Sequence, residues 1–321
     1  MMRSFIVVCF LAIHTVLSKD VIDETVSKHG ALSVKGTTLV NQNGEIVQLK
    51  GMALYWSIWK PQYWNAETVK SIHSNCHSNV VRASMAVDTN DGGYLKDPDG
   101  QLALVETVIK AAIDNDIYIV VDWHEEHATD NLLVAKEFFD YISKTYGGYP
   151  NILYEPFNEP LEVTWSSDLK PFYLEIIKTI RANDPDNVII LGTPSWSQRV
   201  DEAADDPITE YDNIMYTLHF YAGSHKQWLR DLAKGAIDKG LPIFVTEYGV
   251  DNVDLPQYID VEESNSWWTF LDENNISYTN WAVCDVDEMS AACVADTTPA
   301  QVCADGYLTE SGKMVVAQNS K

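Results

Sequence analysis

Eight short apolar segments with the composition of buried β-strands recur along the chain, and the segments between them carry helical periodicity. The expected strands are Gln48–Leu54, Asn79–Met85, Ile117–Trp123, Ile152–Phe157, Val188–Gly192, Ile214–His219, Ile243–Thr246 and Ile276–Val283. Strands that are each followed by a helix predict an α/β fold of the (β/α)8 TIM-barrel type. A doubly wound open sheet is the alternative, but no glycine-rich phosphate loop follows the first strand.

A short β-hairpin is expected before the barrel. Ser33 to Leu49 alternates polar and apolar residues around Asn43-Gly44, a dipeptide typical of hairpin turns.

Two glutamates stand where expected strands end. Glu159 closes the segment ILYEPFNEP, and Glu247 directly follows the strand at 243–246. In a (β/α)8 barrel the C-terminal strand ends form the active site. A partly buried carboxyl group there can keep its proton near neutral pH and donate it, while a second one attacks, which is the pairing that a glycosidase needs. Taken singly, each glutamate is more often a solvated loop residue.

The remaining strand ends also carry polar or aromatic residues, namely Arg82, His124, His219, Tyr221 and Trp281. A buried arginine requires a carboxylate partner, and the mouth of the barrel would offer one. A lone histidine or tryptophan usually has only a structural role. So many such residues at one end of a barrel nevertheless indicate a functional site.

The charge and the N-terminus limit partners and location. The chain has 22 basic and 47 acidic residues and a net charge of −25, which argues against nucleic acid and anionic membranes as partners. Residues 1–18 carry a basic start and a short apolar run, which predict a cleaved signal peptide and secretion. We expect residues 19–321 to form one monomeric catalytic domain without a carbohydrate-binding module.

Four cysteines remain after removal of the signal peptide, and they allow three connectivities. Cys293 and Cys303 flank one polar loop and are the expected pair, while Cys284 is expected to be a free, buried thiol. Asn275-Ile276-Ser277 matches the pattern of a glycosylation acceptor.

Six motifs resemble glycoside hydrolase family 5. In chain order they are VVRASM, IVVDWHEEHA, ILYEPFNEP, LHFYAGSH, VTEYG and TNWAV. The pattern is similar to the large endoglucanase subfamily of bacteria and of plant-feeding nematodes and insects, and GMALYWSIW and LTESGK also fit it. The resemblance covers residues 31–314, and six motifs in order are far more specific than the tripeptide NEP alone.

The resemblance implies catalytic roles for five of these positions. Glu159 would be the general acid/base, with Asn158 bonded to the sugar 2-hydroxyl. Glu247 would be the nucleophile, and Arg82 and Tyr221 would hold it ionised and oriented. The two carboxyl groups should then lie roughly 5–5.5 Å apart, as in retaining enzymes. No cofactor or metal is required.

The resemblance also implies sugar-contacting residues, which are Tyr55, Trp59, His124, Trp196, His219 and Trp281. Trp281 would form the floor of the cleavage subsite, Trp59 would serve a glycone subsite and Trp196 an aglycone subsite, because sugar faces stack on indole rings. Two departures stand out. Asp285-Val286 replaces the family's Asp-Lys pair, which leaves Glu288 as a tentative glycone contact, and Glu126-His127 replaces His-Glu.

The expected function is that of a secreted, retaining endo-β-1,4-glucanase acting on cellulose-like β-glucan. The same scaffold also supports activity on mannan, xylan or mixed-linkage glucan. An inactive, glycan-binding barrel is the alternative from another class, although a lectin would not need an ionised nucleophile.

Overall fold

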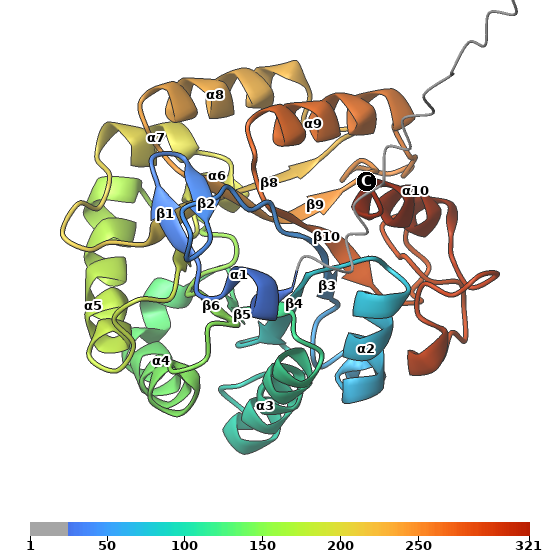
Figure 1. The fold of residues 1–321 in the computed structure, drawn as a ribbon, viewed down its shortest axis with the longest axis horizontal. Coiled ribbons are helices and arrows are strands. Elements are labelled where there is room, and N and C mark those ends of the chain that lie inside the picture. The colour runs from blue at the N-terminus through green and yellow to red at the C-terminus, as the bar shows by residue number, and fades with distance from the viewer. Residues whose placement is uncertain (1–24) are drawn as a thin grey trace, which may run out of the picture.

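The computed structural model describes residues 25–321, so the expected signal peptide lies outside the described residues. Parallel strands form a closed barrel in the order β10-β3-β4-β5-β6-β7-β8-β9 (Figure 1). Their bounds are β3 Lys50–Leu54, β4 Val80–Ala86, β5 Tyr118–His124, β6 Ile152–Glu155, β7 Ile189–Leu191, β8 Ile214–Tyr221, β9 Ile243–Gly249 and β10 Tyr278–Val283. Each strand overlaps its expected segment, which confirms the (β/α)8 fold.

Helices surround the barrel on its outside (Figure 1). The longer ones are α2 Ala66–Ser74, α3 Pro98–Asp114, α4 Leu132–Tyr146, α5 Lys170–Arg181, α7 Val200–Asp205, α8 Gln227–Asp238, α9 Val261–Glu273 and α10 Glu310–Asn319. The shorter ones are α1 Val26–His29, α6 Pro194–Ser197, η2 Pro61–Tyr63, η3 Ala128–Asn131, η4 Trp165–Leu169 and η5 Pro299–Gln301.

The helices form where sequence patterns favour them. In α5 apolar residues at helical spacing form the buried face. In α3 the Asp97 carboxylate caps the first turn by accepting from the Gly100 amide, and Pro98 occupies the first helical position. None of the helices in the described part of the chain combines the length and hydropathy that a membrane crossing requires.

Residues 25–49 cover the N-terminal end of the barrel. Helix α1 and the hairpin β1 Ser33–Lys35 and β2 Thr38–Val40 lie across this end in Figure 1. Apolar side chains from the segment pack against inward-facing residues of six strands or strand starts, in one buried cluster that includes Leu32, Leu39 and Leu49. Burying each such leucine stabilises the fold by about 1.5–3 kcal/mol. The segment closes the barrel at its N-terminal end, opposite the C-terminal strand ends.

The hairpin turn differs from the expected one. Strands β1 and β2 pair Lys35 with Thr38 and turn at Gly36, whose φ is +61°. Asn43-Gly44 makes a second turn, flanked only by a single bridge between Val40 and Ile46. The Asn41 side chain accepts from the amides of residues 43 and 45. These local bonds take up amides that a longer strand ladder would have used.

The disulfide prediction was wrong, because Cys303 is bonded to Cys76 and not to Cys293. The segment after η5 packs on the C-terminal end of α2, where Asn75 donates to the Val302 carbonyl at 3.0 Å, and this brings the two Cα atoms to 5.2 Å. Cys293 is instead paired through its backbone with Leu308.

Cys284 is a free buried thiol, as expected, and so is Cys293. Burial raises the pKa of Cys284 to about 12 and that of Cys293 to about 11, so both remain thiols at neutral pH.

Candidate active site

A cavity of about 690 Å³ opens at the C-terminal ends of the strands. Its lining brings together distant parts of the sequence, namely Glu159, Ser195, Trp196, Gln198, His219, Tyr221, His225, Glu247, Asp251, Asn252, Val253, Gln257, Trp281, Glu288 and Ser290. The two predicted catalytic glutamates therefore share one cavity with four further predicted site residues, Trp196, His219, Tyr221 and Trp281.

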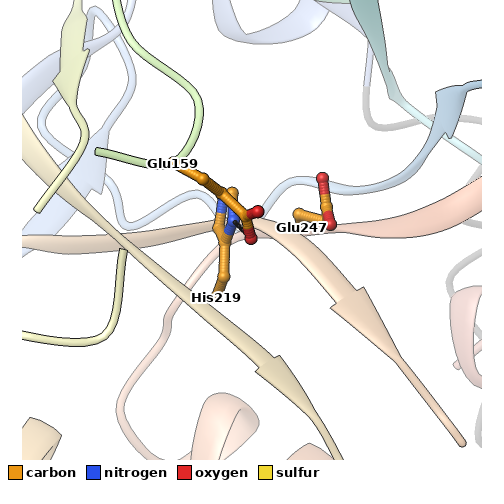
Figure 2. Close-up of side chains that lie close together, drawn as sticks. All are labelled: Glu159, His219 and Glu247. Atoms are coloured by element: carbon orange, nitrogen blue, oxygen red, sulfur yellow. Dashed lines mark hydrogen bonds and ion pairs between the residues drawn. The ribbon is translucent and has the colours of Figure 1, made fainter. Parts of the chain in front are cut away.

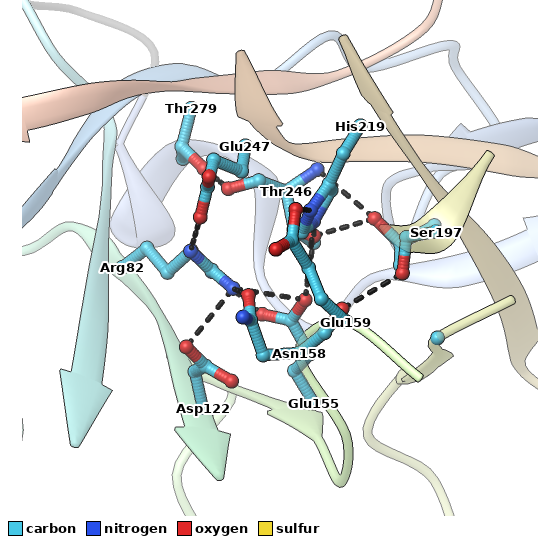
Figure 3. A network of polar contacts seen from close by, with 12 residues as sticks. Arg82, Asp122, Glu155, Asn158, Glu159, Ser197, His219, Thr246, Glu247 and Thr279 are labelled. Carbon is cyan, nitrogen blue, oxygen red and sulfur yellow. Dashed lines mark hydrogen bonds and ion pairs between the residues drawn. The ribbon is translucent and has the colours of Figure 1, made fainter. Parts of the chain in front are cut away.

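Arg82 on β4 is the fully buried centre of the site (Figure 3). Its guanidinium reaches three carboxylates: Nε to Glu155 at 2.7 Å, Nη1 to Glu247 at 2.9 Å and Nη2 to Asp122 at 2.9 Å. Burial opposes the charge of Arg82, but these carboxylates outweigh burial and raise its pKa. The predicted need for a carboxylate partner is confirmed, with three partners instead of one.

Glu247 on β9 is held by a donor at each oxygen. Arg82 donates to Oε2, and the Tyr221 hydroxyl donates to Oε1 at 2.8 Å. Strands β8 and β9 pair His219 with Glu247 and Tyr221 with Gly249. A Cβ at Gly249 would lie 2.3 Å from the Tyr221 ring, so only glycine lets the phenol approach this closely. The two donors fix the orientation of this nearly buried carboxylate.

Glu159, just beyond β6, faces Glu247 across the cavity. Its Oε1 lies 2.9 Å from Nδ1 of His219, and its side chain remains 16% exposed. One oxygen of each glutamate and one ring nitrogen of His219 all lie within 4.8 Å of one another (Figure 2). This trio is the one group in the described part of the chain that offers ligand atoms for a cation at such spacing, but Arg82 and Tyr221 already donate to Glu247.

Three buried residues complete the network and were not predicted: Asp122, Glu155 and Thr246. Asp122 accepts from Arg82 and lies 2.6 Å from Nδ1 of His124. Burial and the Arg82 charge lower the pKa of His124 to about 3, so its ring is neutral. The sequence does carry a signal for Asp122 and Glu155, because each is an acidic residue inside an apolar strand, in IVVDWH and ILYE. A carboxylate buried in this way requires a buried cation as its partner.

Asn158 is oriented by the same arginine. Arg82 Nη2 donates to its Oδ1 at 2.6 Å, so the Asn158 amide nitrogen remains available as a donor. Its own carbonyl accepts from the Ser197 hydroxyl at 2.7 Å, which ties this strand end to the loop that carries Trp196.

Aromatic side chains line one side of the site. The Trp281 ring stacks parallel on His124 with centroids 5.2 Å apart. The Tyr55 ring packs against the other ring of this pair, Trp281, with centroids 5.3 Å apart. Tyr55 donates to Glu288 and also contacts Trp59, whose centroid is 6.4 Å away. Trp59 is exposed at the rim and does not line the cavity itself.

Trp196 stands on another side of the cavity, with half of its side chain exposed. Residues 195, 196 and 197 all have left-handed backbone conformations, with φ of 59°, 57° and 54°. Runs of this kind are costly without glycine and persist only where surrounding contacts hold them. Ser197 supplies such a contact through its bond to the Asn158 carbonyl.

Two residues from the loops after β9 and β10 bear on the cavity. Asp251 is fully buried and lines it, and neither of its carboxyl oxygens has a hydrogen-bond partner among residues 25–321. Burial raises the Asp251 pKa to about 7. Glu288, the tentative glycone contact, also lines the cavity, whereas Asp285 is engaged by Lys60 at 2.6 Å.

Comparisons with known proteins agree on one family. The model of the cellulase family, glycosyl hydrolase family 5, matches residues 40–287. The chain is 46% identical over 268 residues to Endoglucanase Z of Dickeya dadantii, covering 83% of this chain and 61% of that protein. It is 40% identical over 319 residues to an endoglucanase of Clostridium saccharobutylicum, covering 97% and 70%. The chain thus spans less than two thirds of the first of these relatives.

Solved structures give the same result. A structure from Cytophaga hutchinsonii matches with a TM-score of 0.89 at 45% identity, over 92% of this chain and 95% of that one. The catalytic domain of a Thermobifida fusca endoglucanase, solved as a variant with cellotetraose, matches with a TM-score of 0.85 at 30% identity, over 92% and 99%.

Proposed function

The chain belongs to glycosyl hydrolase family 5, the cellulase family, and from this premise we propose that it is a retaining endo-β-1,4-glucanase. One observation carries the proposal: oxygens of Glu159 and Glu247 lie within 4.8 Å of each other in contrasting environments. Retaining glycosidases place their two carboxyl groups about 5–5.5 Å apart, whereas inverting ones need about 6.5–9.5 Å to admit a water.

The first step joins Glu247 to the sugar. The Glu247 carboxylate attacks the anomeric carbon, the bond from that carbon to the glycosidic oxygen breaks, and the oxygen leaves with the proton of Glu159. Arg82 and Tyr221 hold the nucleophile in place. The Asn158 amide is oriented to donate to the 2-hydroxyl, where a bond that tightens in the transition state lowers the barrier.

The second step releases the sugar. Glu159, now a carboxylate, takes a proton from a water molecule, whose oxygen attacks the anomeric carbon while Glu247 leaves. Two displacements restore the original anomeric configuration. Trp281 lines the cavity and offers a flat face to the reacting sugar, and Trp196 offers a second stacking surface. His124 is buried outside the cavity lining and supports the Trp281 ring by stacking on it.

The substrate proposal rests on the relatives and on the aromatic surfaces. Relatives named endoglucanase and a related structure containing cellotetraose support a β-1,4-glucan. We extend the proposal to secretion, because a disulfide between Cys76 and Cys303 suits an oxidising compartment and residues 1–18 have the pattern of a signal peptide. Sequencing the N-terminus of protein recovered from medium would test it.

The decisive experiment follows hydrolysis by the wild type and by Glu159→Gln and Glu247→Gln. Carboxymethylcellulose, mixed-linkage β-glucan, xylan and mannan are compared side by side, and the first-formed anomer is read by proton NMR. We expect glucan hydrolysis with β-anomer formed first. Loss of general acid catalysis costs about 10²–10⁴-fold. Glu175→Gln, which removes a surface carboxylate paired with Lys136, is the matched control.

Other outcomes discriminate among the alternatives. Preference for mannan or xylan keeps the mechanism and changes the substrate. A first-formed α-anomer contradicts retention. A folded wild type that binds glucan but hydrolyses none of the four substrates supports the glycan-binding barrel instead.

A further inference from the structure

A buried chain of hydrogen bonds runs from Glu155 to His219 beneath the catalytic glutamates (Figure 3). Thr246 stands at its centre, with its Oγ1 2.5 Å from Glu155 Oε1, 2.9 Å from His219 Nε2 and 2.5 Å from Thr217 Oγ1. All four residues are between 0% and 1% exposed, so water does not compete for these bonds. The direction of each bond therefore follows from counting protons.

Glu155 can only accept. Burial opposes its charge, but Arg82 outweighs burial and lowers the Glu155 pKa to about 2. The hydroxyl of Thr246 must therefore donate to Glu155, since two acceptors would otherwise face each other at 2.5 Å. A hydroxyl has a single proton, so Thr246 can only accept from its other two neighbours.

The remaining bonds are consistent with this direction. The Thr246 amide donates to Thr217 Oγ1 at 3.2 Å, which leaves the Thr217 hydroxyl proton free to point at Thr246. The other lone pair of Thr246 then receives the N–H of His219 Nε2. A ring protonated only on Nδ1 would reverse the Thr246 hydroxyl and leave Glu155 without this donor.

We propose that Thr246 and Glu155 are positioning residues that keep a proton on Nε2 of His219, so that its Nδ1 shares one further proton with Glu159. The inference rests on the proposed role of Glu159 as acid/base. The shared proton lies in the 2.9 Å contact between Nδ1 and Glu159 Oε1. It is either on the imidazolium, which donates to the carboxylate, or on the carboxyl group, which donates to the neutral ring.

This arrangement gives His219 a part in both steps. In the first, the shared proton passes to the glycosidic oxygen, and the Glu159 carboxylate is left facing an unprotonated Nδ1. Two acceptors in contact repel each other, which favours capture of a proton from the attacking water in the second step. A ring fixed with its proton on Nδ1 would instead stabilise the carboxylate and weaken Glu159 as an acid.

The charges around His219 support a proton held by the pair. Carboxyl groups face it from three strands: Glu155 and Glu159 in and after β6, Glu247 on β9, and Asp122 on β5, whose pKa burial raises well above its ordinary value. Burial opposes protonation of His219, but Glu155, Glu159 and Glu247 outweigh it and raise the His219 pKa to about 9. Burial lowers the pKa of nearby His225 to about 4, so His225 adds no charge near neutral pH.

The direct test is nitrogen-15 NMR of histidine-labelled enzyme, with the His219 signals identified through a His219→Gln variant. Spectra are recorded from about pH 5 to about pH 10. We expect Nε2 to stay protonated throughout while Nδ1 changes. A neutral ring that carries its proton on Nδ1 overturns the proposal. This readout does not depend on hydrolysis, so its failure is separate from failure of the glucanase assignment.

Variants provide a second test through the pH dependence of kcat/KM. Thr246→Val removes the acceptor of the Nε2 proton, so the alkaline limb should move to lower pH by about one unit. Thr246→Ser keeps a hydroxyl and should restore the limb. Thr279→Val is the matched control, because the Thr279 hydroxyl donates to the Thr246 carbonyl and lies outside the proton chain.

The outcomes are distinct. An equal shift of the alkaline limb in Thr279→Val overturns the proposal, because the limb would then respond to packing. No shift in Thr246→Val also overturns it, because the limb would then not depend on the Thr246 hydroxyl. If Thr246→Val does not fold, the NMR measurement on the wild type decides.

Discussion

Tyr221 donates its hydroxyl proton to the oxygen of Glu247 that Arg82 leaves free, across 2.8 Å. Burial and the Glu247 charge raise the pKa of Tyr221, so the phenol keeps this proton over the working range of pH. The proposed nucleophile is thus held from two strands at once, and the phenol is the donor that can be removed without taking away a buried charge.

Tyr221→Phe should lower kcat by about 10- to 100-fold, since a hydrogen bond to a charged group is worth about 1.5–3 kcal/mol. Tyr258→Phe, which removes a hydroxyl bonded to the Gly223 carbonyl, is the control. An unchanged kcat in Tyr221→Phe would show that Arg82 alone is enough to hold the Glu247 carboxylate in place.

Trp196→Ala should raise KM on long cello-oligosaccharides by about 2- to 12-fold with little change in kcat, because stacking contributes about 0.5–1.5 kcal/mol to binding. Trp228→Ala offers a close match, as Trp228 is 51% exposed against 50% for Trp196 but lies on α8 outside the cavity lining. Steady-state kinetics on oligosaccharides of increasing length would measure the difference. Equal effects in both variants would remove Trp196 from the binding surface.

Cys76→Ser should lower the free energy of unfolding by as much as about 5 kcal/mol in the chain-entropy account, because the bond spans 227 residues of sequence. Cys293→Ser removes a thiol that is free and should have a far smaller effect. Denaturant unfolding and peptide mapping without reduction test both statements. A mapped peptide joining 293 to 303 would restore the pairing expected from sequence.

Asp251→Asn should change how stability depends on pH. Burial raises the Asp251 pKa from 3.8 to about 7, so the folded state holds this proton more tightly than the unfolded chain does. Stability due to this group is therefore present below about pH 4 and lost as pH rises through about 7. The variant should gain up to about 4 kcal/mol over the wild type above pH 7, relative to acid pH.

Urea unfolding at acid and at mildly alkaline pH would measure the Asp251 effect. Asp238→Asn, an exposed carboxylate beside Lys234, serves as the control. A constant difference between Asp251→Asn and the wild type at both pH values would mean that Asp251 does not titrate in this window.

The sequence predicted the barrel well because each strand is a compact apolar run with turn or helix signals on both sides. The same regularity located Glu159, Glu247, His219 and Tyr221, since residues near strand ends must meet at one end of a closed barrel. Arg82 lies inside β4 and reaches this end through its long side chain. At these positions the strand pattern in the sequence and the closure of the barrel predict the same placement.

The residues that were missed depend on contacts between distant segments. Thr246 looks like any strand threonine until β8 and β6 bring His219 and Glu155 to its hydroxyl. The Cys76–Cys303 bond depends likewise on how residues 284–309 fold back over α2, and no spacing in the chain encodes that path. The left-handed turn at Trp196 contains no glycine, so the usual signal for such a backbone is absent.

Residues 25–49, which cover the N-terminal end of the barrel, affect how this enzyme can diversify. Apolar residues of that segment seal the end of the barrel remote from the glutamates, and they share no side chain with the substrate cavity. Rim loops such as 195–198 and 251–258 can therefore be exchanged or lengthened while the seal remains intact. Conversely, a deletion of the residues that precede β3 would expose the barrel core to water. The protein would then unfold although Glu159 and Glu247 are still present.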